Sequence, residues 1–356
     1  MATTDLGTRL ALVTGAMGWL GASFVEALAN GLPECEQFAR PQPDLRIRCF
    51  IMPGQDAQQL KALSPRIEIV EGDLRSMEDC RRFWSGASGA ILFHTAGVIH
   101  PQRVSEFYDV NVRGTTNVID AGMEAGLRRA VVISSNSPCG CNPHPDHLFD
   151  EESPYNPYMK YGHSKMLMEL AVKHRIDEKG LDAVILRPPW FYGPHQPARQ
   201  TLFFRMIRDG KAPIVGGGRN LRSMAYTDNI VQGMLLAATD DRASGETFWI
   251  ADERSYSMNE IIDTVEHLLE SEFGQTCTHK RMRLPGLASE VAGLVDGSLQ
   301  RVGMYHQKIH VLSEMNKTIA CSVGKAKRVL GYRPHIGLEE GMRRSLKWAA
   351  TAYGQI

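Results

Sequence analysis

A tyrosine and a lysine four residues apart, Tyr161 and Lys165, are the pair in this chain best suited to acid/base chemistry. At this spacing the two side chains share one face of a helix. An ammonium group beside a phenol favours the phenolate and lowers the pKa of the phenol. A tyrosine perturbed in this way can exchange a proton near neutral pH. The pair therefore predicts an acid/base centre.

Two other motifs precede this pair. The glycines Gly15, Gly18 and Gly21 follow a short apolar stretch near the start of the chain. Glycines at a strand-to-helix turn let the backbone approach a pyrophosphate, whose charge faces the helix N-terminus. Ser134 and Ser135 end another apolar stretch, and strand alternation lets only one of them face a cleft. A nucleotide-binding turn with an acid/base tyrosine predicts hydride transfer at a carbinol or carbonyl carbon.

The identity of the nucleotide depends on the residues after the second and third predicted strands. An acidic residue after the second strand would bind an adenosine ribose, and an arginine would bind a 2′-phosphate. The chain has Met52 there and neither determinant, and the missing cation favours NAD over NADP. Asp73 follows the third strand, where its carboxylate either accepts a hydrogen bond from adenine or caps a helix. Both interpretations of Asp73 stay open.

Other strand ends and one helix supply further candidates. Thr95, Ala96 and Gly97 follow the fourth predicted strand, where small residues let a cofactor lie against the backbone. Asn111 lies in a long helical pattern, where it either interrupts the backbone ladder and holds a water molecule or lies on the surface. The complete set of predicted cofactor-binding residues is Gly15, Met17, Gly18, Trp19, Leu20, Gly21, Met52, Asp73, Leu74, Thr95, Ala96, Gly97, Tyr161, Lys165 and Pro188.

One cluster has the residue types of a zinc site. Cys139, Cys141, His144 and His147 lie in a single short segment. Their spacing is tighter than in structural zinc sites, and prolines stiffen the segment. The sequence therefore favours an active-site loop here, and no metal is expected.

The elements that position these groups alternate along the first half of the chain. Short Ile- and Val-rich stretches cover residues 10–14, 47–51, 67–70, 90–94, 130–134 and 183–186, and helical patterns cover residues 19–30, 104–125 and 157–178. This alternation predicts an α/β fold of Rossmann type with a doubly wound parallel sheet. Prolines and glycines break the pattern after Arg187, so we expect a smaller, mostly helical substrate-binding domain. The predicted nucleotide-binding domain is residues 1–187 plus about 225–252, and the substrate-binding domain is residues 188–224 plus 253–356.

Composition restricts the partners of the protein. Its 356 residues include 40 basic and 40 acidic side chains, so the net charge is zero. No overall basic field is available to recruit nucleic acid or anionic lipid. No apolar run approaches the ~20 residues needed to span a bilayer, and the start has no signal-peptide pattern. Seven scattered cysteines without a Cys-x-x-Cys pair are typical of reduced thiols, so a cytoplasmic location is expected.

Taken in order, these motifs resemble the extended short-chain dehydrogenase/reductase family, also called the NAD-dependent epimerase/dehydratase superfamily. The resemblance implies that Tyr161 is the proton donor or acceptor and that Lys165 orients the nicotinamide ribose and lowers the pKa of the tyrosine. It implies that Ser135 binds the reacting oxygen and that Asn111 serves a proton relay. It also implies a homodimer, in which the helices of residues 104–125 and 157–178 pair across a two-fold axis.

Two branches of that family stay open. Residues 94–101 and the end of the chain resemble the 3β-hydroxysteroid dehydrogenase/isomerase-like branch. Trp190 and Phe191 lie where nucleotide-sugar epimerases and dehydratases usually carry an asparagine, and this aromatic pair favours an apolar substrate. Arg219 and Arg222 keep the sugar branch open because they can clasp a diphosphate. The predicted substrate residues are Ser134, Asn136, Trp190, Phe191 and Arg222.

The sequence therefore predicts an NAD(P)-dependent oxidoreductase that interconverts a secondary alcohol and a ketone on a fairly apolar small molecule. A nucleotide-sugar epimerase or dehydratase with tightly bound NAD is the alternative.

Overall fold

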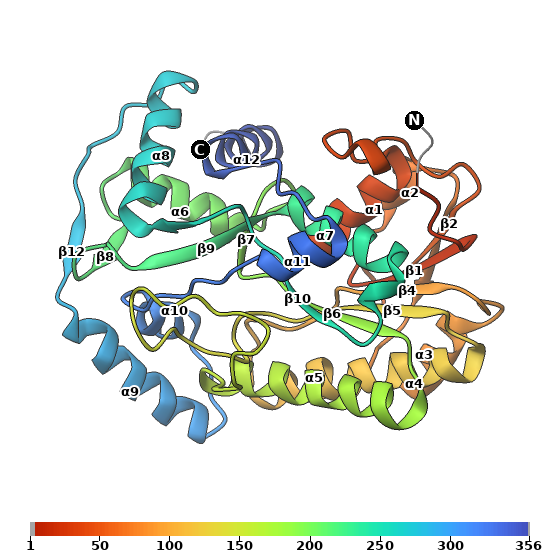
Figure 1. The fold of residues 1–356 in the computed structure, drawn as a ribbon. Coiled ribbons are helices and arrows are strands. Elements are labelled where there is room, and N and C mark those ends of the chain that lie inside the picture. The colour runs from red at the N-terminus through yellow and green to blue at the C-terminus, as the bar shows by residue number, and fades with distance from the viewer. Residues whose placement is uncertain (1–3, 355–356) are drawn as a thin grey trace.

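A seven-stranded parallel sheet organises the computed structural model, which describes residues 4–354 (Figure 1). The strand order is β10-β6-β5-β4-β1-β2-β3, so the order reverses beside β1, where Rossmann-type folds bind nucleotides. Both faces of the sheet are covered, which explains the continuous apolar runs of its inner strands. The strands are β1 (Leu10–Thr14), β2 (Arg46–Ile51), β3 (Ile67–Glu71), β4 (Ile91–His94), β5 (Arg129–Ile133), β6 (Ala183–Arg187) and β10 (Thr247–Trp249).

Helices cover the two faces of this sheet as separate layers (Figure 1). One layer contains α1 (Trp19–Asn30), α2 (Gln58–Leu63), α7 (Thr227–Thr239) and α11 (Gly324–Leu330). The other contains α3 (Met77–Trp84), α4 (Thr115–Ala125) and α5 (Met159–Lys179). The predicted Rossmann-type doubly wound fold is therefore confirmed.

The helix predicted for residues 104–125 contains an irregular segment. Its first part is the π-helix η2 (Phe107–Gly114), which continues directly into α4. Such wide turns are often found at functional sites. Asn111 lies inside this segment and is fully buried, so the interpretation of Asn111 as a surface residue is wrong.

Two small sheets follow the large one. They contain β7 (Trp190–Tyr192), β9 (Leu221–Tyr226) and β11 (Ser255–Ser257), and β8 (Pro213–Val215) with β12 (Met282–Leu284). A separate apolar core lies among them and their helices. The helices of this core are α6 (Ala198–Arg208), α8 (Met258–Ser271) and α12 (Leu338–Tyr353), whereas α9 (Leu287–Arg301) and α10 (Gln307–Glu314) pack against each other.

One late segment packs with the large sheet. Val323, Ala326, Leu330 and Tyr332 belong to the same buried cluster as β1 and α7. The Tyr332 hydroxyl donates a hydrogen bond to the carbonyl of Ala251 at 2.8 Å. The sequence had assigned this segment to the substrate-binding domain, whereas its core contacts lie with the nucleotide-binding sheet.

A transmembrane helix is not found among residues 4–354, because no helix there is both long and apolar enough to cross a bilayer.

Candidate active site

The glycine turn joins β1 to α1 and packs directly on the end of β4. Gly15 has φ +70°, and a Cβ atom there would lie 2.7 Å from the Cα of Ala96. A Cβ atom at Gly21 would collide with the carbonyl oxygen of Gly15. Helix α1 begins after Gly18 without a side-chain cap, so its first N–H groups are available to an anion. The residues present therefore fit a dinucleotide pyrophosphate.

Gly21→Ala is expected to weaken NAD binding by roughly tenfold or more in Kd, because the methyl group displaces the backbone of the turn. Isothermal titration with NAD measures the effect. Gly217→Ala is the matched control, since the nearest atom to a Cβ there is 3.9 Å away and belongs to the flexible Arg219 side chain. Equal affinities for the two variants would contradict the assignment of this turn.

A buried histidine connects the turn to the π-helix. The His94 ring contacts the hydroxyl of Thr14 at 2.7 Å and the hydroxyl of Thr115 at 2.8 Å. Complete burial lowers the pKa of His94 to about 3, with a smaller effect from nearby Lys165. A neutral imidazole therefore ties β1 to α4. No sequence motif marks His94 as a structural link, because it occupies the last position of an otherwise apolar strand.

Asn111 holds the loop after β4 against α5. Its amide nitrogen donates to the carbonyl of Val98 and to the hydroxyl of Ser164, both at 3.1 Å. Its amide oxygen accepts from the Val98 N–H at 2.8 Å. A Cβ atom at Gly97 would lie 3.3 Å from that oxygen and 3.5 Å from the Lys165 Nζ. The structure thus brings Gly97, Asn111 and Lys165 together, and the proton-relay role of Asn111 stays a prediction.

Helix α5 places Tyr161 beside the end of β5. The Tyr161 hydroxyl has a hydrogen bond with Ser135, which lowers its pKa, but burial has the larger effect and raises that pKa to about 12. The Lys165 ammonium donates to the carbonyl of Ile133 at 2.9 Å. In the protein alone, burial raises the pKa of Tyr161 overall, and the lowering by Lys165 that the sequence suggests stays a prediction.

Burial lowers the pKa of Lys165 to about 8. The unfolded chain therefore binds more protons than the folded chain between about pH 8 and about pH 10.4, and stability rises with pH in that window. Lys165→Met removes this burial cost but leaves the Ile133 carbonyl without its donor. We expect Lys165→Met to be more stable by about 1–2 kcal/mol near pH 7, with an advantage that shrinks toward about pH 10. Urea unfolding of both proteins at the two pH values measures it, and a pH-independent difference would contradict it.

Ser134 faces away from Tyr161. Its hydroxyl donates to the Glu169 carboxylate at 2.5 Å, in a buried network in which Arg187 also binds Glu169 at 2.6 Å and Tyr155 donates to it at 2.7 Å. Successive strand residues point to opposite sides, so Ser135 faces the site and Ser134 does not. The prediction of Ser134 as a substrate residue is therefore corrected.

The residues predicted to bind the adenosine part of the cofactor follow β2 and β3, away from Tyr161 and Lys165 in the sheet order. The Asp73 carboxylate accepts hydrogen bonds from the backbone and guanidinium of Arg75, and these keep the pKa of Asp73 below its usual value. Ser76, not Asp73, caps α3 by accepting from the N–H of Asp79 at 3.2 Å. The capping interpretation of Asp73 is therefore wrong. Met52 follows β2 and is exposed, and Leu74 is buried.

The aromatic residues predicted to bind substrate, Trp190 and Phe191, lie in β7. The rings of Phe191 and Trp19 lie 4.9 Å apart, and the Trp19 indole donates to the carbonyl of Pro194 at 2.7 Å. The rings of Trp190 and Phe203 lie 5.9 Å apart. The Trp19 contacts join the glycine turn to β7, whereas Trp190 points to the other side of that strand, toward Phe203. Buried Pro188 lies between β6 and β7.

The two polar residues predicted to bind substrate, Asn136 and Arg222, lie after β5 and in β9, respectively. Asn136 follows Ser135, and its amide oxygen accepts from the Ser135 hydroxyl at 3.4 Å. Arg222 is buried on β9, where its guanidinium donates to the backbone carbonyl of Glu314. Burial lowers the pKa of Arg222, and the nearby Glu314 carboxylate opposes that shift. Its Nε has no hydrogen-bond partner within residues 4–354.

Further residues near Tyr161 carry no sequence motif and come from η2, the loop after β4, α9, α10 and the loop between these two helices. The Phe107 ring lies 5.7 Å from Tyr161 and 5.6 Å from Tyr305, whose hydroxyl contacts His100 at 2.7 Å. His310 binds Asp296 at 2.7 Å, and both are buried. No motif marked these residues, because only tertiary packing brings them to Tyr161.

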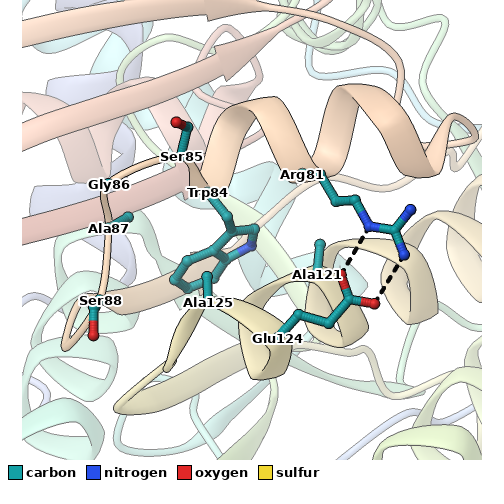
Figure 2. A pocket seen from close by; sticks show the side chains of 9 residues that line it. All are labelled: Arg81, Trp84, Ser85, Gly86, Ala87, Ser88, Ala121, Glu124 and Ala125. Atoms are coloured by element: carbon teal, nitrogen blue, oxygen red, sulfur yellow. Dashed lines mark hydrogen bonds and ion pairs between the residues drawn. The ribbon is translucent and has the colours of Figure 1, made fainter.

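Two other features lie outside the centre. Within the described part of the chain, no three His, Cys, Asp or Glu side chains are grouped so that they could hold a metal. An open hollow of about 290 Å³ lies beside Trp84. Figure 2 shows its lining side chains and the Arg81–Glu124 ion pair among them. None of its lining residues belongs to the predicted site.

Comparisons with known proteins identify the family and agree with the fold. The chain is 52% identical to the uncharacterized protein y4nL of Sinorhizobium fredii over 96% of both chains. It is 28% identical to 3beta-hydroxysteroid-dehydrogenase/decarboxylase isoform 1 of Arabidopsis thaliana, over 95% of this chain and 79% of that protein. The fold matches DesIV, a dTDP-glucose 4,6-dehydratase from Streptomyces venezuelae solved with NAD bound. The TM-score is 0.74 at 24% identity, over 97% of this chain and 98% of that one. Residues 11–251 match the description "NAD dependent epimerase/dehydratase family". The chain therefore belongs to this family of NAD-dependent enzymes.

Proposed function

We propose that this protein is a dehydrogenase that interconverts a secondary alcohol and a ketone on an apolar substrate, with Tyr161 as the general acid/base. The observation that carries the proposal is the Ser135–Tyr161 hydrogen bond in the same buried site as Lys165, whose ammonium lies next to Gly97 after β4. When bound, NAD exchanges a hydride with the substrate carbon.

The protein groups have distinct roles in this proposal. The Ser135 hydroxyl binds the substrate oxygen, and Tyr161 gives a proton to that oxygen or takes one from it. Because the pKa of Tyr161 is about 12 in the protein alone, the phenol is protonated at neutral pH and ready to act as the acid in ketone reduction. Lys165 would hold the nicotinamide ribose, and the Gly15 and Gly21 turn would hold the pyrophosphate.

The apolar substrate is supported by two independent observations. Two separate aromatic pairs flank β7, Trp19 with Phe191 next to the glycine turn and Trp190 with Phe203 on the other side of the strand. A relative that aligns with nearly this whole chain is named for 3β-hydroxysteroid dehydrogenation. A 3β-hydroxysteroid is a ring-fused secondary alcohol, and its apolar surface is of the kind that aromatic side chains bind.

A nucleotide-sugar epimerase or dehydratase is the second candidate. Arg222 favours it, because this buried cation has an Nε that lacks a partner among the described residues, and a diphosphate would supply one. Such an enzyme returns the hydride to the same substrate molecule and keeps its NAD.

Two measurements on one sample separate the candidates. The purified protein is denatured and the released nucleotide identified by mass spectrometry, and the intact protein is assayed for NADH formation with dehydroepiandrosterone and, separately, with UDP-glucose. Reversible NAD binding with steroid-dependent NADH formation supports the dehydrogenase. Stoichiometric retained NAD without net NADH formation supports the epimerase or dehydratase.

We also propose that the enzyme is a cytoplasmic homodimer and that it uses NAD in preference to NADP. Its two-fold contact is formed by α5 together with η2 and α4, and residues 188–224 and most of 253–356 bind the substrate.

A further inference from the structure

Helix α9 is built with its polar side inward. Its buried face carries Ser289, Ala292, Asp296 and Gln300, which recur at helical spacing. The opposite face exposes large apolar side chains: Leu287 is 70% exposed, Val291 50%, Leu294 75% and Val295 43%. A helix at the surface of a protein in water normally has the reverse arrangement. The outward face of α9 therefore fits an apolar environment outside the molecule.

Three large apolar residues that follow α9 in the chain, Val302, Met304 and Val311, are also exposed, at 71%, 58% and 44%. Figure 1 shows α9 at the outer edge of the molecule, below β12 and beside the start of α5. We call the outward residues of α9 together with Val302, Met304 and Val311 the apolar face. Grouped exposure of this kind marks an interaction surface.

Basic side chains in and beside the same elements are left without carboxylate partners. Arg283, Arg301 and Lys308 are all exposed, and within the described residues none of them forms an ion pair. The exposed carboxylate of α9, Glu290, is already neutralised by Lys317. The overall charge balance of the chain thus conceals a local excess of positive charge.

We propose that the apolar face docks on an anionic lipid bilayer and lies in its interfacial plane. An amphipathic helix with leucines on one side and basic residues around it binds membranes in this way. Helix α9 has 15 residues, which is too short to span a bilayer. A second copy of the chain fits this face less well, because a two-fold contact would place the unpaired cations of both copies together.

The inner side of α9 adjoins the catalytic helix. The Gln300 side chain accepts from the N–H of Lys160 at 2.9 Å, one residue before Tyr161. A hollow of about 290 Å³ lies at this junction, lined by Pro157, Met159, Lys160, His163, Gly297, Gln300 and Arg301. Docking would thus bring the bilayer next to the start of α5. That an apolar substrate enters from the bilayer rests on the proposed function, whereas the docking itself does not.

Vesicle flotation with the full-length protein tests the docking. The probes are vesicles of phosphatidylcholine alone and of phosphatidylcholine mixed with an equal part of phosphatidylglycerol. We expect binding to the anionic vesicles that weakens as salt rises. The double variant Leu287→Gln/Leu294→Gln should lose roughly tenfold or more in affinity. Arg283→Gln/Lys308→Gln should lose about tenfold on the anionic vesicles only.

The matched control is Leu202→Gln on α6, where the leucine is 53% exposed. This variant should bind vesicles as the unmodified protein does. NAD titration and thermal unfolding of every sample show that the proteins are folded, and light scattering gives their mass. Absence of binding by a protein that binds NAD would overturn the docking and leave the proposed function standing. The docking would also be overturned if the double variant Leu287→Gln/Leu294→Gln converted a dimer into a monomer and still bound vesicles as the unmodified protein does.

Discussion

Tyr161→Phe is expected to lower kcat for alcohol oxidation by about 10²–10⁴-fold while NAD still binds. Phenylalanine keeps the ring contact with Phe107, 5.7 Å between centroids, but removes the hydroxyl that pairs with Ser135. The proton then has no protein acceptor at the substrate oxygen. Initial rates of NADH formation give kcat, and tryptophan fluorescence gives the Kd for NAD.

Tyr108→Phe provides the comparison for this variant. The Tyr108 hydroxyl contacts the His163 ring at 3.2 Å, on the other side of the same helix pair. Losing it should leave kcat within a factor of about two, since it touches neither Ser135 nor Lys165. Full activity in Tyr161→Phe would remove Tyr161 from the mechanism, and equal losses in the two variants would indicate a structural effect only.

Glu169→Gln is expected to reduce the free energy of unfolding by about 3–5 kcal/mol, because it leaves a buried arginine without its counter-charge. Arg187 is 2% exposed, and it binds both oxygens of the fully buried Glu169 at 3.0 and 2.6 Å. Its guanidinium also lies over the rings of Tyr155 and Trp249. Urea unfolding at neutral pH measures the change.

Glu124→Gln is the control for this substitution. It removes a carboxylate from the Arg81 pair at the rim of the hollow in Figure 2, where both side chains are more than half exposed, at 59% and 51%. Water screens such a pair, so stability should hardly change. A loss in Glu169→Gln no larger than in Glu124→Gln would mean that water reaches the Arg187 network.

Local patterns were sufficient for most of the large sheet. The structure gives β1 and α1 the bounds that the sequence predicted, and β2 to β6 shift by one residue at most. Parallel strands covered on both faces need continuous apolar runs, which are easily recognised. The glycine turn and the Tyr161–Lys165 pair were equally visible, because each is defined within a few residues.

Properties that depend on distant packing were not visible. Asp73 has the residue type of a helix cap, yet Arg75 takes its carboxylate and Ser76 caps the helix. Asp296 and His310 meet each other only when α10 folds onto α9. The periodicity of α9 marks an amphipathic helix, but periodicity alone does not say which side faces inward. That orientation is set by the buried Asp296 and Gln300, which bind His310 and the start of α5.

The return of residues 323–332 to the large sheet affects how the chain can fold. Leu330 and Tyr332 complete a core whose other members begin at Leu6, so this core closes only after nearly the whole chain has left the ribosome. Contacts so far apart in sequence slow folding, and an unfinished core exposes apolar surface to aggregation. The nucleotide-binding and substrate-binding parts of the chain are therefore expected to unfold in one cooperative step. A fragment that ends before Val323 is expected to depend on chaperones.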